Sequence, residues 1–110
     1  MKYVCLVYLE EQRLRDVPDR ECLACGDDMR ASNRLVAAEA LQPADTARTL
    51  RIRDGKVKVT DGPFAETKEM LAGFYLIEAK DEAEALEIAS KIPPARIGSV
   101  EVRPVRTLEP

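Results

Sequence analysis

Residues 3–9 read YVCLVYL, and this run is apolar at every position. Successive side chains of a β-strand point to opposite faces, so a strand with this pattern carries apolar side chains on both faces. The run ends at Glu10 and Glu11, too short for a membrane span and wrongly flanked for a signal peptide. It predicts a buried strand in a cytoplasmic protein. The two sets of side chains are Tyr3, Cys5 and Val7 on one face, and Val4, Leu6 and Tyr8 on the other.

The composition describes a chain that can bury its own core. Of the 110 residues, 45% are hydrophobic, which fits one folded domain over residues 1–110. The net charge of -3 offers no basic field, so neither nucleic acid nor a membrane is expected as a direct partner. Three scattered cysteines do not make a disulfide framework, which also fits the cytoplasm.

The segment after the first strand has the features of a helix. Pro18 is a favoured first helical residue, and acidic residues follow it at the positive end of the helix dipole. These features predict a helix from residue 18 to about Val36, then a short strand in AAEALQP (residues 37–43). The apolar residues that recur at helical spacing are Cys22, Cys25, Met29 and Val36.

The next segment, TLRIRDGKVKVT (residues 49–60), predicts a β-hairpin. Apolar and polar side chains alternate on both sides of Asp54 and Gly55, a dipeptide that suits a two-residue type I′ turn. We expect this hairpin to be an insertion in the main sheet.

The last part of the chain predicts a strand, a helix and a strand. GFYLIEA (residues 73–79) is the first strand, and Asp81 with Glu84 three residues later forms a capping-box start to the helix. Pro93 and Pro94 end that helix, and SVEVRPV (residues 99–105) is the final strand. The helix would bury Ala85, Ile88, Ala89 and Ile92, and the final strand would carry Val100 and Val102 on one face and Glu101 and Arg103 on the other.

Without the hairpin, the predicted order is β-α-β-β-α-β, a ferredoxin-like α+β arrangement with two helices on one face of an antiparallel sheet. Two helices can cover only one sheet face, and the strands at residues 3–9 and 73–79 are apolar on both. A large exposed apolar patch is rare on a monomer. We therefore expect a homodimer with face-to-face sheets and a cleft near their edges.

At residues 60–69 (TDGPFAETKE) the chain resembles the YCII-related proteins, in particular the branch named for the Asp-Gly-Pro-Phe (DGPF) signature. The segments RIRDGKVKVT, AGFYLIEA, IPPARIGSVEVRPV and the initial MKYVCLVY also look like family pattern. The resemblance implies a dimeric α+β barrel and an association with alternative sigma factors. Some members resemble enzymes with a proposed His-Asp pair, which this sequence lacks because it contains no histidine.

The signature itself has a structural and a functional interpretation. In the first, Asp61 caps a turn that Pro63 starts, Gly62 takes a backbone conformation closed to other residues, and Phe64 pins the loop to the body. In the second, the loop frames the dimer cleft, with Asp61, Gly62, Pro63 and Phe64 as ligand-binding residues and Lys68 as an anion contact. Asp61 would then be a general base or a hydrogen-bond acceptor.

Two further patterns concern cysteine and tyrosine. Cys22 and Cys25 have the C-x-x-C spacing of redox and metal sites, but with one other thiol and no histidine a closed zinc site cannot form without carboxylates. We interpret them as apolar residues on the buried stripe of the helix, and no metal or other cofactor is expected. Tyr8 and Tyr75 lie on strands of like parity and could offer hydroxyl groups to a ligand in the cleft, although such tyrosines are more often core residues.

These observations leave two main functional hypotheses. The first is a non-catalytic dimeric domain that binds a small organic ligand or regulates a partner, such as the sigma factor or other transcription protein that the resemblance implies. The second is a small-molecule lyase or isomerase acting in the dimer cleft, with Asp61 as base and Tyr75 as proton donor or orienting group. A dimeric scaffold without a ligand is a third possibility that the sequence does not separate from the first.

Overall fold

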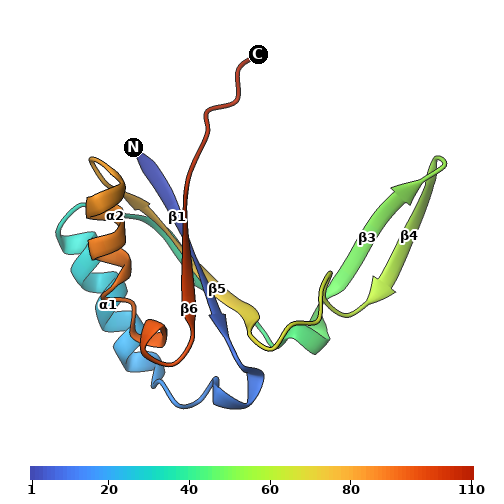
Figure 1. Ribbon diagram of the computed structural model, residues 1–110, viewed down its shortest axis with the longest axis horizontal. Helices are drawn as coiled ribbons and strands as arrows, with labels where there is room; N and C mark the ends of the chain where they lie inside the picture. Colours follow the sequence, from blue (N-terminus) through green and yellow to red (C-terminus); the bar gives the residue numbers. More distant parts are fainter.

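A computed structural model describes residues 1–110 and shows an α+β protein with two antiparallel sheets and two α-helices (Figure 1). The four-stranded sheet has the order β2-β5-β1-β6, and β3 pairs with β4 in a separate two-stranded sheet. The strands are β1 (Lys2–Leu9), β2 (Leu35–Ala40), β3 (Arg48–Arg53), β4 (Lys56–Asp61), β5 (Met70–Glu78) and β6 (Ser99–Pro104). The helices are α1 (Asp19–Ala31) and α2 (Glu82–Ala89), with short 3-10 helices at Glu11–Arg13, Ala44–Thr46 and Pro93–Arg96.

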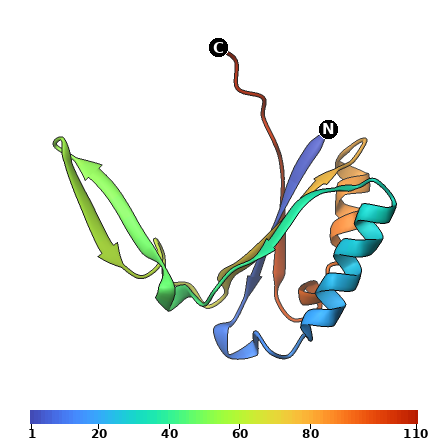
Figure 2. The same ribbon diagram turned by 180° about the vertical axis from the view of Figure 1, so that it is seen from behind.

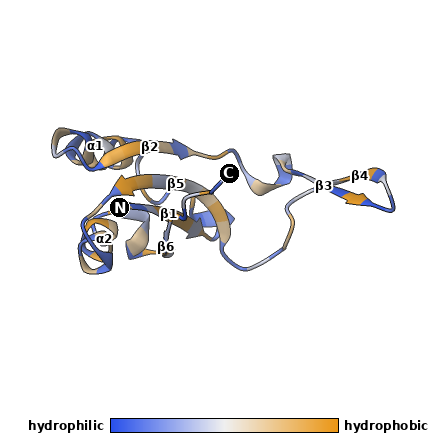
Figure 3. Ribbon diagram, turned by 90° about the horizontal axis from the view of Figure 1, so that it is seen from above, coloured by the Kyte–Doolittle hydropathy of each residue, from blue (hydrophilic) through white to orange (hydrophobic).

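The four-stranded sheet and the helices form a two-layer unit. All three strand pairings are antiparallel, and both helices lie on the same side of the sheet, as the view from above shows (Figure 3). This arrangement is consistent with the expected ferredoxin-like α+β fold, with β3 and β4 as an addition to it. The core between sheet and helices consists of Tyr3, Cys5, Val7, Met29, Tyr75, Ile77, Ala79, Ala85, Ile88, Ala89 and Ile92.

The other face of the sheet has no helix over it. Alternate residues of β1 are half-buried instead of buried, and the strand register pairs Val4 with Leu76 and Leu6 with Phe74 across to β5. Paired residues of neighbouring strands share a face, so these four side chains form one apolar surface. We call this surface, together with Tyr8, the uncovered face.

The first helix is shorter than the sequence predicted. It ends at Ala31, and Val36, which we placed in the helix, lies in β2. Asn33 has a φ of 60°, and the N–H of Arg34 donates to the carbonyl oxygen of Met29 at 2.8 Å. This left-handed residue after a helix closes the last turn and ends it, a signal that apolar spacing alone does not show.

The predicted hairpin is confirmed. Asp54 and Gly55 have φ values of 52° and 73°, the two positive angles that a type I′ turn requires. β3, the turn and β4 form an arm (residues 48–61) that projects from the two-layer unit (Figures 1 and 2). The radius of gyration is 15.6 Å, compared with about 13 Å for a compact chain of this length.

The predicted start of the second helix is confirmed as well. The N–H of Glu84 donates to Asp81 Oδ1 at 2.9 Å, and Glu84 Oε1 accepts from the N–H of Lys80 at 3.1 Å. The helix ends at Ala89, before Pro93 and Pro94. Neither α-helix of the protein is long and apolar enough to cross a membrane.

Candidate functional site

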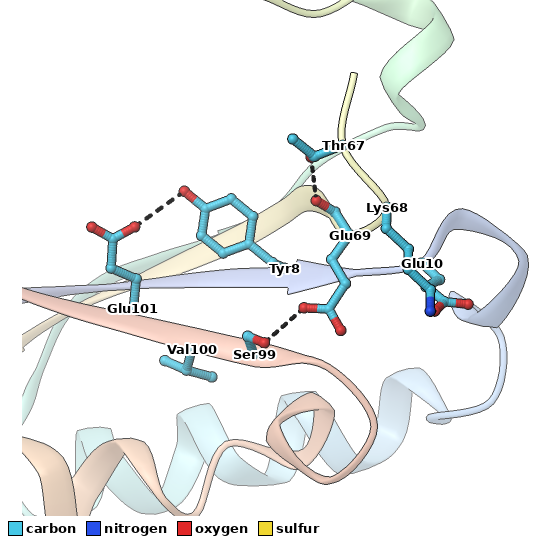
Figure 4. Close-up of a pocket in the computed structure, with 8 residues that line it drawn as sticks. All are labelled: Tyr8, Glu10, Thr67, Lys68, Glu69, Ser99, Val100 and Glu101. Carbon is cyan, nitrogen blue, oxygen red and sulfur yellow. Dashed lines mark hydrogen bonds and ion pairs between the residues drawn. The ribbon is translucent and has the colours of Figure 1, made fainter. Parts of the chain in front are cut away.

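A pocket of about 600 Å³ opens beside the uncovered face, at the end of the sheet from which the arm departs (Figure 4). Three segments that are distant in the sequence form it: the end of β1, the loop before β5 and the start of β6. The lining residues are Tyr8, Glu10, Thr67, Lys68, Glu69, Ser99, Val100 and Glu101.

Local backbone features place these segments together. The register of β1 against β5 shifts between Val7 and Tyr8, because Ala72 of β5 has no partner in β1; this bulge bends β5 beside Tyr8, next to the loop that lines the pocket. On the other side, β6 pairs Ser99 with Tyr8. Gly98 precedes this pair, and a side-chain carbon there would collide with the carbonyl oxygen of Tyr8, so β6 enters the sheet this closely only with glycine at that position.

Hydrogen bonds between side chains and loop atoms hold the wall of the pocket (Figure 4). The hydroxyl of Tyr8 donates to Glu101 Oε1 at 3.4 Å, and the hydroxyl of Ser99 donates to Glu69 Oε1 at 2.7 Å. The hydroxyl of Thr67 donates to the backbone oxygen of Glu69 at 2.6 Å, which fixes the loop before β5. Carboxylates of β6 and of the loop before β5 therefore face one space, oriented by neighbouring hydroxyl groups.

The charge of the pocket is negative. Three carboxylates line it, those of Glu10, Glu69 and Glu101, against the single ammonium group of Lys68. Lys68 Nζ lies 3.4 Å from Glu10 Oε1, so its charge is already matched within the chain. The lining suits a ligand that donates hydrogen bonds or carries a positive charge, and it disfavours an anion.

Of the seven residues that the sequence analysis considered for ligand binding, the structure brings Tyr8 and Lys68 together in this pocket. The four signature residues, Asp61, Gly62, Pro63 and Phe64, are not among its lining residues; they lie where β4 ends and the chain leaves the arm. In this chain the ammonium group of Lys68 pairs with the Glu10 carboxylate.

The structural interpretation of the signature is partly correct. Gly62 has a φ of 97°, as expected for a conformation that favours glycine, and its N–H donates to the carbonyl oxygen of Ala47 at 2.8 Å. The carboxylate of Asp61 does not cap a turn: it lies 3.1 Å from Arg48 Nε, across the base of the arm, and its side chain is 89% exposed. The hairpin pairing explains this difference, because Asp61 is the last residue of β4 and sits opposite Arg48.

The expectation that Phe64 pins the loop to the body is wrong for the single chain. Its side chain is 81% exposed, and its ring lies 5.9 Å from the guanidinium carbon of Arg51 on the arm. The ring therefore contacts the arm and does not reach the core.

Tyr75 and Tyr8 lie on opposite faces of the sheet, contrary to the expectation that both project into one cleft. The register pairs Tyr75 with Cys5 on the helix side, where Tyr75 is buried and its hydroxyl donates to the carbonyl oxygen of Cys22 at 3.5 Å. Burial, and to a lesser extent the nearby thiols of Cys22 and Cys25, raise the pKa of Tyr75 well above its usual value. Its phenol therefore stays protonated at neutral pH.

The three cysteines are free thiols. Cys22 and Cys25 are half-buried on α1 and less deeply buried than expected; burial is the main cause that raises the pKa of both. Burial also raises the pKa of Cys5 to about 11. Raised pKa values make all three poor nucleophiles at neutral pH. A second cavity of about 420 Å³ between the two helices includes Cys25 among its lining residues, and no three potential metal ligands cluster anywhere in the chain.

Sequence reasoning missed most of the pocket. Glu10, Thr67, Glu69 and Ser99 carry no motif that distinguishes them from other polar surface residues. One signal was present: the alternation of the last strand put Glu101 opposite the face of Val100, and therefore on the uncovered side where Tyr8 also lies.

Two comparisons with known proteins bear on this chain. The family model for the YCII-related domain matches residues 1–109. An uncharacterized protein of Rhizobium meliloti (strain 1021) is 44% identical over 81 residues, which are 72% of this chain and 65% of the length of that relative. The domain match covers the four-stranded sheet, the arm and the pocket alike, so the chain belongs to the YCII-related family.

Proposed function

We propose that this protein is a homodimeric, non-catalytic domain that binds a small organic ligand in the pocket around Tyr8. The observation that carries the proposal is the pocket, whose volume of about 600 Å³ falls within the range of ligand sites. It combines the aromatic ring of Tyr8 with hydroxyl and carboxylate groups of fixed orientation. The excess of carboxylates favours a small ammonium or guanidinium compound as the ligand.

The uncovered face supports the homodimer. A sheet face with apolar side chains at its centre needs a cover, and a second copy laying its own uncovered face against it is the simplest one. This assembly is the dimeric α+β barrel that the resemblance implies. The pocket lies beside that face, so it would become a cleft at the margin of the dimer.

A regulatory role completes the proposal. Residues 61–64 read DGPF, the signature of the branch that the chain resembles and that is associated with alternative sigma factors. We place the protein in the cytoplasm. We further propose that binding of the ligand regulates the action of this protein on a sigma factor or another transcription protein. The lyase or isomerase hypothesis gains no support from the geometry, because Asp61 pairs with Arg48 on the arm and the Tyr75 hydroxyl lies under α1.

Ligand-observed NMR with a panel of small amines, guanidines and carboxylates tests the site. We expect amines or guanidines to bind and carboxylates not to bind. Glu101→Gln should weaken binding by roughly tenfold or more, because it removes one charge-assisted hydrogen bond. Glu87→Gln, on α2 and outside the pocket, is the matched control and should bind like the parent. The proposal is wrong if no cationic compound binds, or if Glu101→Gln and Glu87→Gln bind equally well.

A further inference from the structure

The arm has one apolar and one basic face, and neither is covered. The strand register pairs Leu50 with Val59 and Ile52 with Val57, so these four aliphatic side chains lie on the same face. They are 57–62% exposed, an unusual state for four adjacent aliphatic residues of a protein surface. The opposite face carries Arg51, Arg53, Lys56 and Lys58.

An isolated two-stranded hairpin is at best marginally stable in water, so the arm needs a surface to pack against. Its own sheet does not supply one, because the arm projects away from the two-layer unit (Figures 1 and 3). Two hydrogen bonds close its base: Gly62 N–H to the carbonyl oxygen of Ala47 at 2.8 Å, and the Thr49 hydroxyl to the carbonyl oxygen of Gly62 at 2.9 Å. Because these hydrogen bonds join the two ends of the arm, β3 and β4 project from the sheet together.

We propose that the apolar face of the arm packs on the uncovered face of a second copy, beside its pocket, so that each copy covers the site of the other. This inference rests on the homodimer proposed above and adds the element that forms it. One chain carries both an apolar arm and an apolar sheet face without a cover. In a two-fold symmetric dimer the arm of each copy packs on the sheet of the other, so the apolar face of the arm and the uncovered face of the sheet are buried by the same contact.

Charge supports a second copy as the occupant. The arm carries five Lys and Arg residues against Asp54 and Asp61, a net charge of +3. The whole chain carries -3, so the residues outside the arm carry -6. The pocket beside the proposed contact is lined by three carboxylates and one lysine. Opposite net charges of this kind attract two copies at long range and speed their encounter.

The size of the contact also fits. Six residues per strand and two strands give one arm face of about 20 by 10 Å. Two such contacts, counted on both partners, bury about 800 Å², roughly half of a standard interface of about 1,600 Å². The remaining buried area must come from contact between the two uncovered faces. Docking of the arms and packing of the two sheets would therefore occur together.

Cross-linking of the full chain locates the arm directly. A benzophenone side chain is introduced at Val57, on the apolar face, and in a separate protein at Lys58, on the basic face. Nitrogen-15-labelled and unlabelled chains are mixed, refolded together, irradiated and digested. We expect the probe at Val57 to join labelled to unlabelled chains at peptides of β1 and β5, with a much lower yield from Lys58. Products confined to single chains, or attached elsewhere, would overturn the inference.

Sedimentation equilibrium separates failure of the arm from failure of the dimer. Ile52→Ser/Val57→Ser removes two apolar side chains of the arm and should weaken dimerisation roughly 30-fold or more. Arg53→Ser/Lys56→Ser changes the neighbouring cross-strand pair on the basic face and should have a smaller effect. If the parent is dimeric and the two variants dissociate equally, the arm inference is wrong while the dimer stands. A parent that is monomeric at micromolar concentration contradicts both, whereas the NMR experiment tests the ligand site independently.

Discussion

At the scale of single residues, the shape of the pocket depends on an absent side chain. A side-chain carbon at Gly98 would collide with the carbonyl oxygen of Tyr8 and lie 2.8 Å from Leu9 Cδ2. Tyr8 lines the pocket, and Ser99, next to Gly98, does so from the other side. The close approach of β6 to β1 at this point is therefore also what brings Tyr8 and Glu101 within hydrogen-bonding distance.

We predict that Gly98→Ala lowers the free energy of unfolding by about 2 kcal/mol, because backbone must move to accept the methyl group. Gly26→Ala is the matched control: its added carbon meets only Leu35 Cδ2 at 3.9 Å. Inside α1 this change should raise stability by about 0.5–1 kcal/mol. Urea unfolding of the two variants measures both effects. If Gly98→Ala and Gly26→Ala had equal free energies of unfolding, β6 could shift without loss of stability, and Gly98 would not determine the shape of the pocket.

At the scale of elements, α1 and β2 show how one residue divides helix from strand. Apolar spacing carries the helical pattern past Ser32 to Val36, whereas the structure ends α1 at Ala31 and begins β2 at Leu35. The left-handed Asn33 between them is what reverses the chain, and the released segment then pairs with β5. A longer helix would remove the edge strand from the sheet.

Substitutions of Asn33 test this boundary. Glycine adopts a φ of 60° without strain, so Asn33→Gly should keep the free energy of unfolding within about 0.5 kcal/mol of the parent. Valine is strained there, and Asn33→Val should cost about 1–2 kcal/mol. Thermal or urea unfolding followed by circular dichroism distinguishes the two variants. A neutral Asn33→Val would mean that the turn has no need of a left-handed residue.

At the scale of the whole molecule, the protein consists of a two-layer unit with its own core and an arm with none. All of the core residues lie in the unit, and the arm has no buried residue. The arm departs and returns at neighbouring points, since Gly62 hydrogen-bonds to Ala47. The unit should therefore fold without the arm, whereas the dimer proposed above should not form without it.

A variant in which Gly-Ser replaces residues 48–61 tests this division. We predict that it unfolds cooperatively, like the parent, because the core is intact. If the full chain forms the proposed dimer, the variant should sediment as a monomer at the same concentrations, because the arm surface of the interface is gone. A deletion variant that remains dimeric would assign the interface to the sheet faces alone.

The sequence by itself determined the features that depend on neighbouring residues: the unbroken apolar run of β1, the turn at Asp54 and Gly55, and the cap at Asp81. It also determined that one apolar sheet face lies opposite the helices, because period-two patterning assigns side chains to faces. Only the tertiary structure decided that Tyr75 faces the helices, that Asp61 pairs with Arg48, and that Tyr8 shares a pocket with Glu69 and Glu101. These arrangements depend on strand register and on the close approach at Gly98, contacts between residues far apart in the chain that no local pattern specifies.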